Sequence, residues 1–192
     1  MTEVETETAG ARVTTRLGDD GYTSLLGPDR VPKYSSRPTA LGTLDEATSA
    51  LGLARAMAVE PRVGEFVLEL QKGLYKLMAE LATPAENLEK VPFVTTQADV
   101  QRLEQICAEL TETVEIGKEF IIPGSSRCGA ALDLGRAIVR RGERHVAEMV
   151  HNGEVENLDA LRWLNRLSDT AFILARYVER SGAAEWSEPK AD

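Results

Sequence analysis

Apolar residues recur every three or four positions over five stretches of this chain, and this spacing limits the possible folds more than any other feature of the sequence. Residues 64–81 show it most clearly, because their apolar side chains fall on one helical face: Phe66, Leu70, Leu74, Leu77 and Leu81. No stretch has a convincing strand pattern, and aromatic residues are only 5% of the chain, so Leu, Ile, Val and Ala must supply most of the core. We therefore predict an all-α fold, a five-helix bundle that follows a Gly/Thr-rich segment.

Local signals predict where the other helices begin and end. Thr43 and Glu46 have the spacing of a capping box, which predicts a first helix starting at Thr43 with Asp45 in its first turn. The third helix is expected over residues 97–115. The fourth should follow a serine pair at 125–126 and the fifth a cap at Asn157, ending near residue 181. On the fourth helix the expected core positions are Ala131, Leu134, Ala137, Ile138, Val146 and Met149.

Length and charge exclude several classes of protein. The 192 residues suit a single domain, here residues 12–181, and the acidic ends 1–11 and 182–192 are expected to be disordered tails. A net charge of −9 argues against binding to nucleic acid or to an anionic membrane. No apolar run approaches 18 residues and no signal peptide is visible. Cys107 and Cys128 are far apart, which is typical of reduced thiols in the cytoplasm, and Cys107 falls on a core stripe.

Residues 120–144 contain the main concentration of positive charge. An apolar run ends at the corner Pro123–Gly124, and the helix beyond it carries Arg136, Arg140 and Arg144 at four-residue spacing. Three guanidinium groups on one face repel one another unless an anion lies over them, and arginine binds phosphate oxygens with paired hydrogen bonds. This arginine stripe is therefore a candidate polyphosphate site. The alternative is a solvated basic face paired with acidic residues of a neighbouring helix.

Residues 14–33 form a second unusual segment, rich in glycine, hydroxyl groups and cations. Backbone N–H groups and hydroxyl groups in such a loop can point at phosphate oxygens. The P-loop pattern GxxxxGK[ST] is absent, and no strand–loop–helix pattern surrounds the segment. The alternative is a cluster of surface turns, although a helix bundle has little structural need for such a segment before its first helix.

Two further polar residues each allow two interpretations. Asp45 either stabilises the positive end of the first helix or pairs with an arginine elsewhere. Asn165, which lies among leucines, either hydrogen-bonds a ligand or holds a neighbouring helix. No catalytic triad, metal-ligand cluster or dinucleotide-binding fingerprint is visible in the sequence.

Several of these segments occur together, in the same order, in one known family. The motifs are TRLGDDGYTSL, VPK, GTLDEATSALGLA, FIIPG, RAIVRRGER and LNRLSDTAFILARYV, between residues 14 and 178. Together they resemble the PduO-type ATP:cob(I)alamin adenosyltransferases. The resemblance implies a helical bundle that assembles as a homotrimer with active sites between adjacent subunits. There cob(I)alamin would attack the 5′ carbon of ATP, which binds with Mg²⁺, and the products would be adenosylcobalamin and triphosphate.

The resemblance also implies roles for individual residues. The implied catalytic residues are Arg136, Arg140, Asp45 and Glu143. Arg140 matches a position around the phosphates, where Glu143 orients the arginines or approaches the metal. Arg136 matches an arginine that pairs with Asp45 across the subunit interface. Phe120 matches an apolar residue that faces the corrin and excludes the lower ligand of cobalt, which makes Co(II) easier to reduce. The implied ATP-binding residues are Thr15, Arg16, Leu17, Gly18, Gly21, Thr23, Ser24, Lys33, Arg140, Arg141, Glu143, Arg144 and Asn165.

Some positions depart from the family pattern. Leu17 replaces a threonine, Ser125–Ser126 replace a second glycine after the corner, and Asp133 stands where histidine is common. Gly135 and Gly142 stand where alanine is common, and since glycine inside a helix costs about 0.5–1 kcal/mol relative to alanine, they predict close packing. The departures motivate an alternative function, a noncatalytic ATP- or corrinoid-binding paralogue that senses, stores or delivers adenosylcobalamin. An active enzyme would further imply a reductase and an acceptor enzyme as partners.

Overall fold

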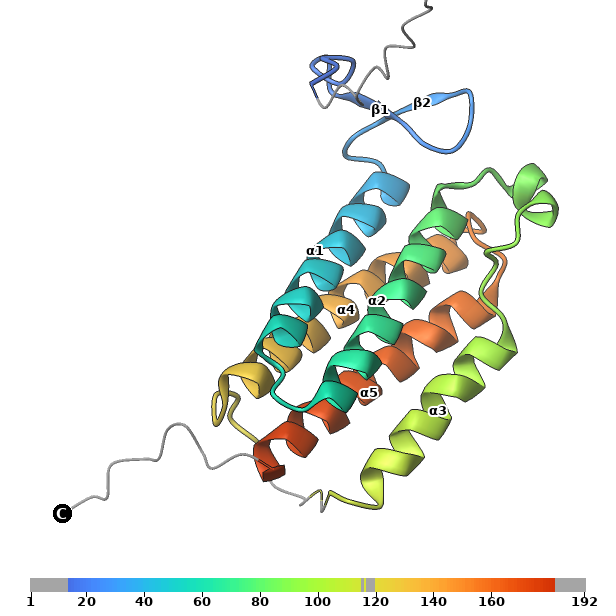
Figure 1. The fold of residues 1–192 in the computed structure, drawn as a ribbon. Coiled ribbons are helices and arrows are strands. Elements are labelled where there is room, and N and C mark those ends of the chain that lie inside the picture. Colours follow the sequence, from blue (N-terminus) through green and yellow to red (C-terminus); the bar gives the residue numbers. More distant parts are fainter. Residues whose placement is uncertain (1–13, 115, 117–119, 182–192) are drawn as a thin grey trace, which may run out of the picture.

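The computed structural model describes residues 14–114, 116 and 120–181 (Figure 1). Its body consists of five long helices: α1 (Ser36–Met57), α2 (Pro61–Ala82), α3 (Gln97–Thr111), α4 (Arg127–His151) and α5 (Leu158–Ser181). A short 3-10 helix, η1 (Ala85–Lys90), and a hairpin of two strands, β1 (Tyr22–Ser24) and β2 (Arg30–Pro32), complete the described elements. The prediction of an all-α, five-helix bundle is confirmed. The predicted tails at 1–11 and 182–192 lie outside the described residues.

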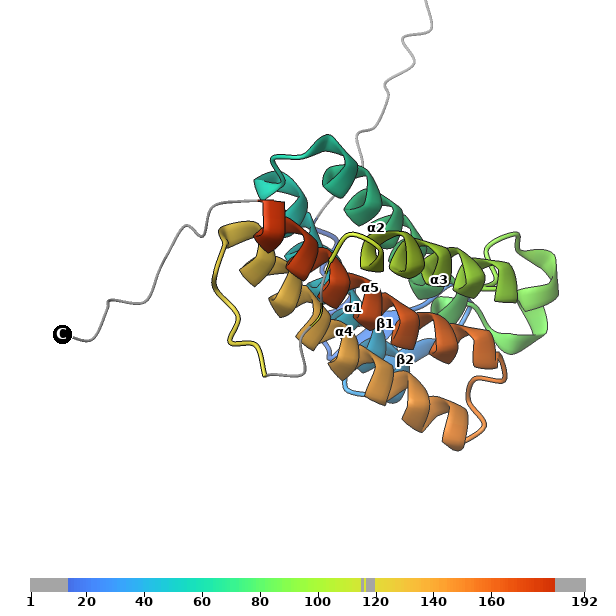
Figure 2. The same cartoon turned by 90° about the horizontal axis from the view of Figure 1, so that it is seen from below.

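The helix α5 connects the two sides of the bundle. It packs against α4 on one side and α3 on the other and also touches α2, as the view in Figure 2 makes clear. The helix α1 packs mainly against α4 and less extensively against α2. Because α3 and α4 pack on the two sides of α5, the outer face of α5 between them stays open. No helix in the described ranges is both long and apolar enough to cross a membrane.

The core contains the apolar stripes that the sequence predicts. The predicted stripe of α2 is buried along its whole length, from Phe66 to Leu81. It meets leucines of α1 and α5 that are fully inaccessible to solvent, namely Leu44, Leu51, Leu164 and Leu167. Burial of each such side chain contributes roughly 1.5–3 kcal/mol, so the stripes account for the main stabilisation of the bundle.

The first helix begins seven residues earlier than predicted. The structure places Ser36 at the start of α1 with Ser35 as N-cap, and the capping box expected at Thr43 is wrong. Thr43 lies inside the helix, where its hydroxyl donates to the Thr39 carbonyl at 2.9 Å. Pro38 does not stop the helix, because it falls in the first turn, where a missing N–H leaves no hydrogen bond unmade. Asp45 is consequently in the middle of α1, on its exposed face, and cannot serve the helix terminus.

The core face of α4 is rotated relative to the prediction. Leu134 is 52% exposed and Ala137 is exposed, whereas Leu132 and Val139 are buried in their place. The reason is the close approach of α1: a Cβ at Gly135 would lie 2.9 Å from Leu51 Cδ2, and one at Gly142 would lie 2.7 Å from Leu44 Cδ2. The expectation that these two glycines mark close packing is confirmed. Of the other predicted positions, Ala131, Val146 and Met149 are buried and Ile138 is half-buried.

Most of the other predicted helix ends are confirmed. The Ser126 hydroxyl accepts from the Gly129 N–H at 3.0 Å, and the Asn157 side chain accepts from the Asp159 N–H at 3.0 Å. The helix α3 begins with a capping box between Thr96 and Asp99 and ends at Thr111, four residues before the predicted end. Burial raises the pKa of Asp99, but hydrogen bonds from the Lys76 ammonium and from Thr96 outweigh it, and the net shift is downward.

The hairpin is the element that the sequence did not reveal. β1 and β2 pair antiparallel with Thr23 opposite Val31, in a segment where no strand was expected. Strands of three residues are too short to display an alternating pattern. The hairpin lies beyond the Ser36 end of α1 (Figure 1), and its turn is tied to α2 by a hydrogen bond from the Leu26 N–H to the Ala82 carbonyl, 3.0 Å long.

Candidate functional site

A pocket of about 600 Å³ lies on the face of α5 that α3 and α4 leave open. Its walls combine cationic, acidic and apolar side chains. The lining residues are Glu104, Cys107, Ile116, Arg136, Arg140, Arg166, Ser168, Asp169, Phe172 and Ile173. Three of them are arginines and two are carboxylates, so the pocket has an excess of positive charge in a chain that is strongly acidic overall. A cavity of this size, with both apolar and charged walls, is typical of a ligand site.

Arg136 is held at the pocket by a buried carboxylate on its own helix. Its Nε lies 3.4 Å from Asp133 Oδ1, and its guanidinium lies over the Phe172 ring at 5.9 Å. Asp133 is only 4% exposed and also accepts a hydrogen bond of 2.6 Å from Arg176, which is itself buried and pairs with Glu179 at 2.9 Å. The departure at position 133 therefore has a structural role, because a histidine there would leave two arginines without this acceptor.

Arg140 is the pocket cation with the fewest partners. Within the described ranges, its guanidinium has no hydrogen bond and no ion pair, and only its carbonyl is engaged, by Arg144 Nη1 at 3.0 Å. Arg144 likewise has no carboxylate partner among the residues that the structure describes. Among the residues that the structure describes, these two arginines have none of the acidic partners on a neighbouring helix that the alternative interpretation of the stripe requires. Two exposed, unpaired guanidinium groups one turn apart suit a polyanion.

Glu143 is oriented toward α5 by an amide. Asn165 Nδ2 donates to Glu143 Oε1 at 3.0 Å, while Asn165 Oδ1 accepts from Arg166 Nη2 at 2.7 Å. Of the two interpretations of Asn165, the structure shows the contact with a neighbouring helix. Arg166 in turn pairs with Asp169 at 3.3 Å. This chain of contacts fixes the position of Glu143 and that of Arg166, which lines the pocket.

Arg141 faces a different direction from the stripe. It pairs with Glu46 on α1 and is not part of the pocket wall. A step of one residue turns a helix by about 100°, so Arg141 and Arg140 cannot both face α5. Within one chain, the structure thus brings together Arg136, Arg140, Glu143 and Asn165 and leaves Arg141 on the α1 side.

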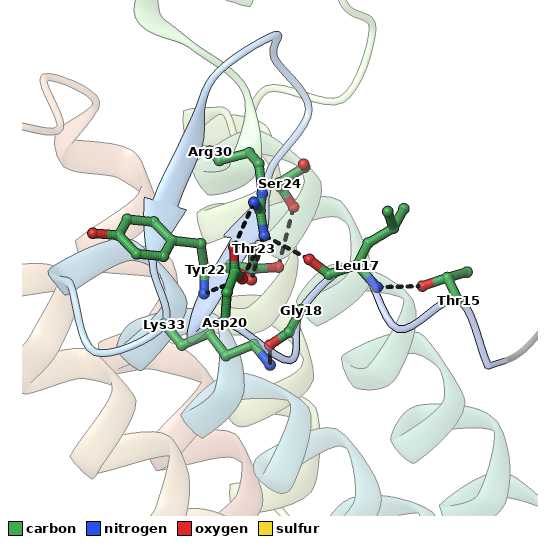
Figure 3. A network of polar contacts seen from close by, with 9 residues as sticks. All are labelled: Thr15, Leu17, Gly18, Asp20, Tyr22, Thr23, Ser24, Arg30 and Lys33. Atoms are coloured by element: carbon green, nitrogen blue, oxygen red, sulfur yellow. Dashed lines mark hydrogen bonds and ion pairs between the residues drawn. The ribbon is translucent and has the colours of Figure 1, made fainter.

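The Gly/Thr-rich segment forms a compact turn held by Arg30, as Figure 3 shows. Arg30 donates to both carboxylate oxygens of Asp20, at 2.8 and 2.7 Å, and to the carbonyls of Leu17 and Tyr22. The hydrogen bonds from Arg30 and from the Tyr22 N–H lower the pKa of Asp20 to about 2. Lys33 Nζ donates to the Gly18 carbonyl at 2.7 Å. Asp20 and Arg30 were not among the predicted site residues. The Asp20 side chain accepts a hydrogen bond from the Tyr22 N–H, two residues later, and this is a turn that aspartate commonly forms.

The predicted ATP-binding residues of this segment lie on the turn and on β1. Thr15 Oγ1 is near the Leu17 N–H at 3.5 Å, and the Leu17 side chain is exposed. Arg16 and Gly21 have positive φ values of 62° and 84° and shape the turn. Thr23 and Ser24 lie on β1 beside it. No residue of the segment lines the pocket, so one chain does not bring the two predicted ATP-binding elements together.

Phe120 and Asp45 are exposed and have no partner in the described part of the chain. Phe120 is fully accessible in the loop before α4, next to the exposed Ile122. Asp45 has no hydrogen bond or ion pair with any residue that the structure describes, and Arg136 does not reach it within the chain. Their predicted roles both require another molecule, a corrin for Phe120 and a second subunit for Asp45.

The described part of the site contains neither an activated thiol nor a cluster of metal ligands. Cys107 is half-buried, its Sγ lies 3.1 Å from Thr170 Oγ1, and burial raises the pKa of its thiol. A raised pKa makes the thiolate scarce, which agrees with the expectation that Cys107 is not a nucleophile. The expected core position is correct only in part, because Cys107 packs against the core but also lines the pocket. Across the described ranges, no three His, Cys, Asp or Glu side chains are grouped to hold a metal ion.

Comparison with known proteins identifies relatives over almost the whole chain. The family described as cobalamin adenosyltransferase matches residues 13–178. The corrinoid adenosyltransferase of Mycobacterium tuberculosis is 36% identical over 91% of this chain and 92% of its own length. The Bacillus subtilis corrinoid adenosyltransferase is 38% identical over 89% of each chain.

Solved structures agree with the sequence comparison. A variant of the PduO-type ATP:corrinoid adenosyltransferase of Lactobacillus reuteri, complexed with cobalamin and ATP, superposes with a TM-score of 0.79 at 31% identity. The match covers 88% of this chain and 94% of that one. A second variant of that enzyme, complexed with ATP, gives a TM-score of 0.78. With the fold, the arginine stripe and these matches together, the chain belongs to the cobalamin adenosyltransferase family.

Proposed function

We propose that this protein is an ATP:corrinoid adenosyltransferase, which transfers the 5′-deoxyadenosyl group of ATP to cob(I)alamin. The observation that carries the proposal is the pair Arg140 and Arg144, which the described part of the chain leaves without acidic partners: Arg140 lines a mixed apolar and cationic pocket, and Arg144 lies one turn further along α4. The relatives named corrinoid adenosyltransferase support it.

The reaction requires no nucleophile from the protein. Co(I) donates an electron pair to the 5′ carbon, a Co–C bond forms, and the C5′–O bond breaks with its electron pair leaving on triphosphate. Cobalt is oxidised from Co(I) to Co(III) in the same step. The protein has to align the two substrates and stabilise the charge that develops on the leaving triphosphate. Arg140 and Arg144 are placed for the second task, and this division agrees with the lack of a reactive thiol at Cys107.

Arg136 and Glu143 have supporting positions in this scheme. Asp133 and Phe172 hold the Arg136 guanidinium at the pocket, and Asn165 holds one oxygen of Glu143, leaving its second oxygen free of protein contacts in the described residues. Mg²⁺ bound to a nucleotide takes one or two carboxylates in addition to phosphates and water. Glu143 is suited to orient the arginines or to approach a Mg²⁺ that enters with ATP.

The ATP site is complete only between two subunits. The segment at 14–33 lies at the hairpin end of the bundle and contributes nothing to the pocket of its own chain. We therefore assign the turn with Lys33 to the ATP of a neighbouring subunit, in a homotrimer. Exposed Asp45, Leu134 and Ala137 on α1 and α4 suit the interface, where Asp45 would pair with Arg136 of the next subunit. The Asp45→Asn variant tests this by its mass in sedimentation and its affinity for corrinoid. If both the trimer mass and the affinity are unchanged, the pairing has no role.

Fully exposed Phe120 is assigned to the corrin, where an aromatic side chain would exclude the lower ligand of cobalt. We place the enzyme in the cytoplasm, with a reductase that supplies cob(I)alamin and an enzyme that accepts adenosylcobalamin.

The deciding experiment is the anaerobic absorption spectrum of cob(I)alamin with this protein, ATP and Mg²⁺. We expect the cob(I)alamin band to disappear as adenosylcobalamin forms. Replacement of Arg140 by Ala should lower kcat by about 10²–10³, the usual effect of removing one donor to a developing anion. The matched control is Arg102→Ala, because Arg102 is an exposed arginine that pairs with Glu69 away from the pocket. Near-normal turnover by Arg140→Ala would remove Arg140 from the mechanism.

The second candidate is a noncatalytic ATP- or corrinoid-binding protein. The exposed Leu17, which lacks the hydroxyl of the usual threonine, favours it, because the segment then offers ATP one hydrogen bond fewer. Folded protein that binds ATP but leaves the cob(I)alamin spectrum unchanged would favour this function over the first.

A further inference from the structure

Four charged side chains meet near the end of α5 that lies beside the start of α4 (Figure 1, Figure 2). Two are the carboxylates of Asp133 and Glu179, and two are the guanidinium groups of Arg136 and Arg176. Arg176 bridges the carboxylates, because its Nη2 lies 2.6 Å from Asp133 Oδ2 and its Nε lies 2.9 Å from Glu179 Oε2. Arg136 Nε faces the other Asp133 oxygen at 3.4 Å. We call these residues the four-charge cluster.

Glu179 is held in the cluster at a cost to stability. Its Oε1 is buried and has no hydrogen-bond partner among the described residues. Burial raises the pKa of its carboxyl, an effect that the Arg176 charge opposes and the Asp133 charge reinforces. A Cβ at Gly129 would lie 2.8 Å from Glu179 Oε1, so the first turn of α4 has room for this carboxylate only because residue 129 has no side chain. The ionised carboxyl is thus less favourable here than in water, and stability alone does not account for it.

The charges of the cluster balance, and burial makes this balance necessary. Arg136 and Arg176 carry like charges over the same Phe172 ring, at 5.9 and 5.2 Å from its centre. Like charges held this close and away from water repel unless each has a counter-charge. Glu179 gives Arg176 a counter-charge besides Asp133, so that Asp133 can also serve Arg136. Without the charge of Glu179, one carboxylate would have to balance two guanidinium groups.

Arg136 is the arginine that would be released if the charge of Glu179 were lost. Its contact with Asp133 is the longer one, 3.4 Å against 2.6 Å for Arg176. Its side chain is also 31% exposed, against 7% for Arg176, and a guanidinium group that can reach water leaves a buried partner more readily. Release would let Arg136 turn away from the pocket that it lines.

We propose that Glu179 is a positioning residue, which acts through Arg176 and Asp133 to hold the Arg136 guanidinium at the pocket. Glu179 itself does not line the pocket. The inference rests on the proposed function for its kinetic readout, in which Arg136 is assigned to the subunit interface and to corrinoid affinity. The arginines assigned to the phosphates lie further along α4, outside the cluster. Loss of the Glu179 charge should therefore weaken corrinoid binding and leave ATP binding nearly unchanged.

The first test compares Glu179→Gln with Glu60→Gln in the full chain. Glutamine keeps the shape of the side chain and removes its charge. Glu60 is the matched control, because its Oε1 accepts a hydrogen bond of 2.8 Å from Tyr177 at the same end of α5 and takes no part in the cluster. In Glu179→Gln we expect KM for the corrinoid to rise about fivefold, with KM for ATP and kcat within about twofold of the wild type.

A second measurement follows Arg136 directly in the substrate-free protein. Its Nε is buried, so the Nε–H proton should exchange slowly with water in the wild type, as NMR can measure. Exchange of this proton should become faster in Glu179→Gln, because Arg136 is then less firmly held. In Glu60→Gln it should stay at the rate of the wild type.

A double variant separates a charge effect from a purely structural one. Glu179→Gln combined with Arg176→Met removes one charge of each sign and leaves Asp133 to Arg136 alone. Buried ion pairs can be replaced by apolar groups of similar volume without loss of the fold. We therefore expect KM for the corrinoid and the Arg136 Nε–H exchange to return toward the wild type, whereas a structural role predicts that two changes impair more than one.

Three outcomes would overturn the proposal: Glu179→Gln matches Glu60→Gln in corrinoid KM and in Nε–H exchange, KM for ATP rises as much as KM for the corrinoid, or the folded double variant is more impaired than the single one. If the double variant does not fold, the comparison of Glu179→Gln with Glu60→Gln decides. If the wild type forms no adenosylcobalamin, the proposed function fails, and Arg136 Nε–H exchange decides without substrate: faster exchange in Glu179→Gln supports the positioning role, and unchanged exchange refutes it.

Discussion

Replacement of Asp133 by Asn tests the buried charge cluster that holds Arg136 at the pocket. The side chains of Asp133 and Arg176 are 3% and 7% exposed, Asp133 Oδ2 lies 2.6 Å from Arg176 Nη2, and Arg176 also pairs with Glu179. Removing one partner of a buried ion pair costs about 3–5 kcal/mol, because the other charge is left unpaired. Since Arg176 keeps Glu179 and the asparagine oxygen still accepts a hydrogen bond, we expect the lower end, about 3 kcal/mol. For a chain of this size, this corresponds to a fall in Tm of roughly 6–12 °C.

Urea unfolding at fixed protein concentration measures the loss, since assembly would otherwise make the midpoint depend on concentration. The matched control is Asp159→Asn. Asp133 also pairs with Arg136 three residues later, and Asp159 forms the same kind of pair with the exposed Arg162. That change should cost no more than about 1 kcal/mol, because exposed pairs contribute little. The reasoning is refuted if the two variants lose the same free energy of unfolding. It is also refuted if Asp133→Asn is as stable as the wild type.

Gly73→Ala should destabilise the protein by about 1–3 kcal/mol or more, because the new Cβ would lie 2.2 Å from Cζ2 of the Trp163 ring. In the same urea assay the control Gly64→Ala should be neutral or stabilising, because the nearest atom to its new Cβ is 4.0 Å away. Folding lowers the pKa of Asp99, so the stability that Asp99 contributes is present above its ordinary pKa of 3.8 and is lost as the pH falls through the folded pKa. The difference in free energy of unfolding between the wild type and Asp99→Asn should therefore shrink below about pH 4. A difference that does not change with pH would contradict this linkage. Phe120→Ala should slow the reaction that starts from cob(II)alamin and a reductant more than the reaction of pre-reduced cob(I)alamin, and equal losses would count against its assigned role.

The sequence predicted the fold correctly where the pattern of apolar residues was periodic. The stripe from Phe66 to Leu81 and the caps at Ser126 and Asn157 are local features, and the structure confirms them. The first helix start was wrong because Thr43 carries a capping-box pattern inside a longer helix, where the same hydroxyl bonds Thr39 instead. A local signal cannot tell a helix terminus from an interior position when the preceding residues are also able to form helix.

The candidate site shows the same division between local pattern and tertiary contact. Four-residue spacing was sufficient to put Arg136, Arg140 and Arg144 on one face, because that spacing is a property of any α-helix. Which side of α4 faces α5 depended on the glycines that let α1 approach, and these contacts put Arg141 against Glu46 and exposed Leu134. The sequence alone determined the helices, the apolar face of α2 and the arginine stripe. The tertiary structure decided the buried Asp133–Arg176 pair and the Asp20–Arg30 pair, because their partners are 43 and 10 residues apart and meet only after the chain has folded.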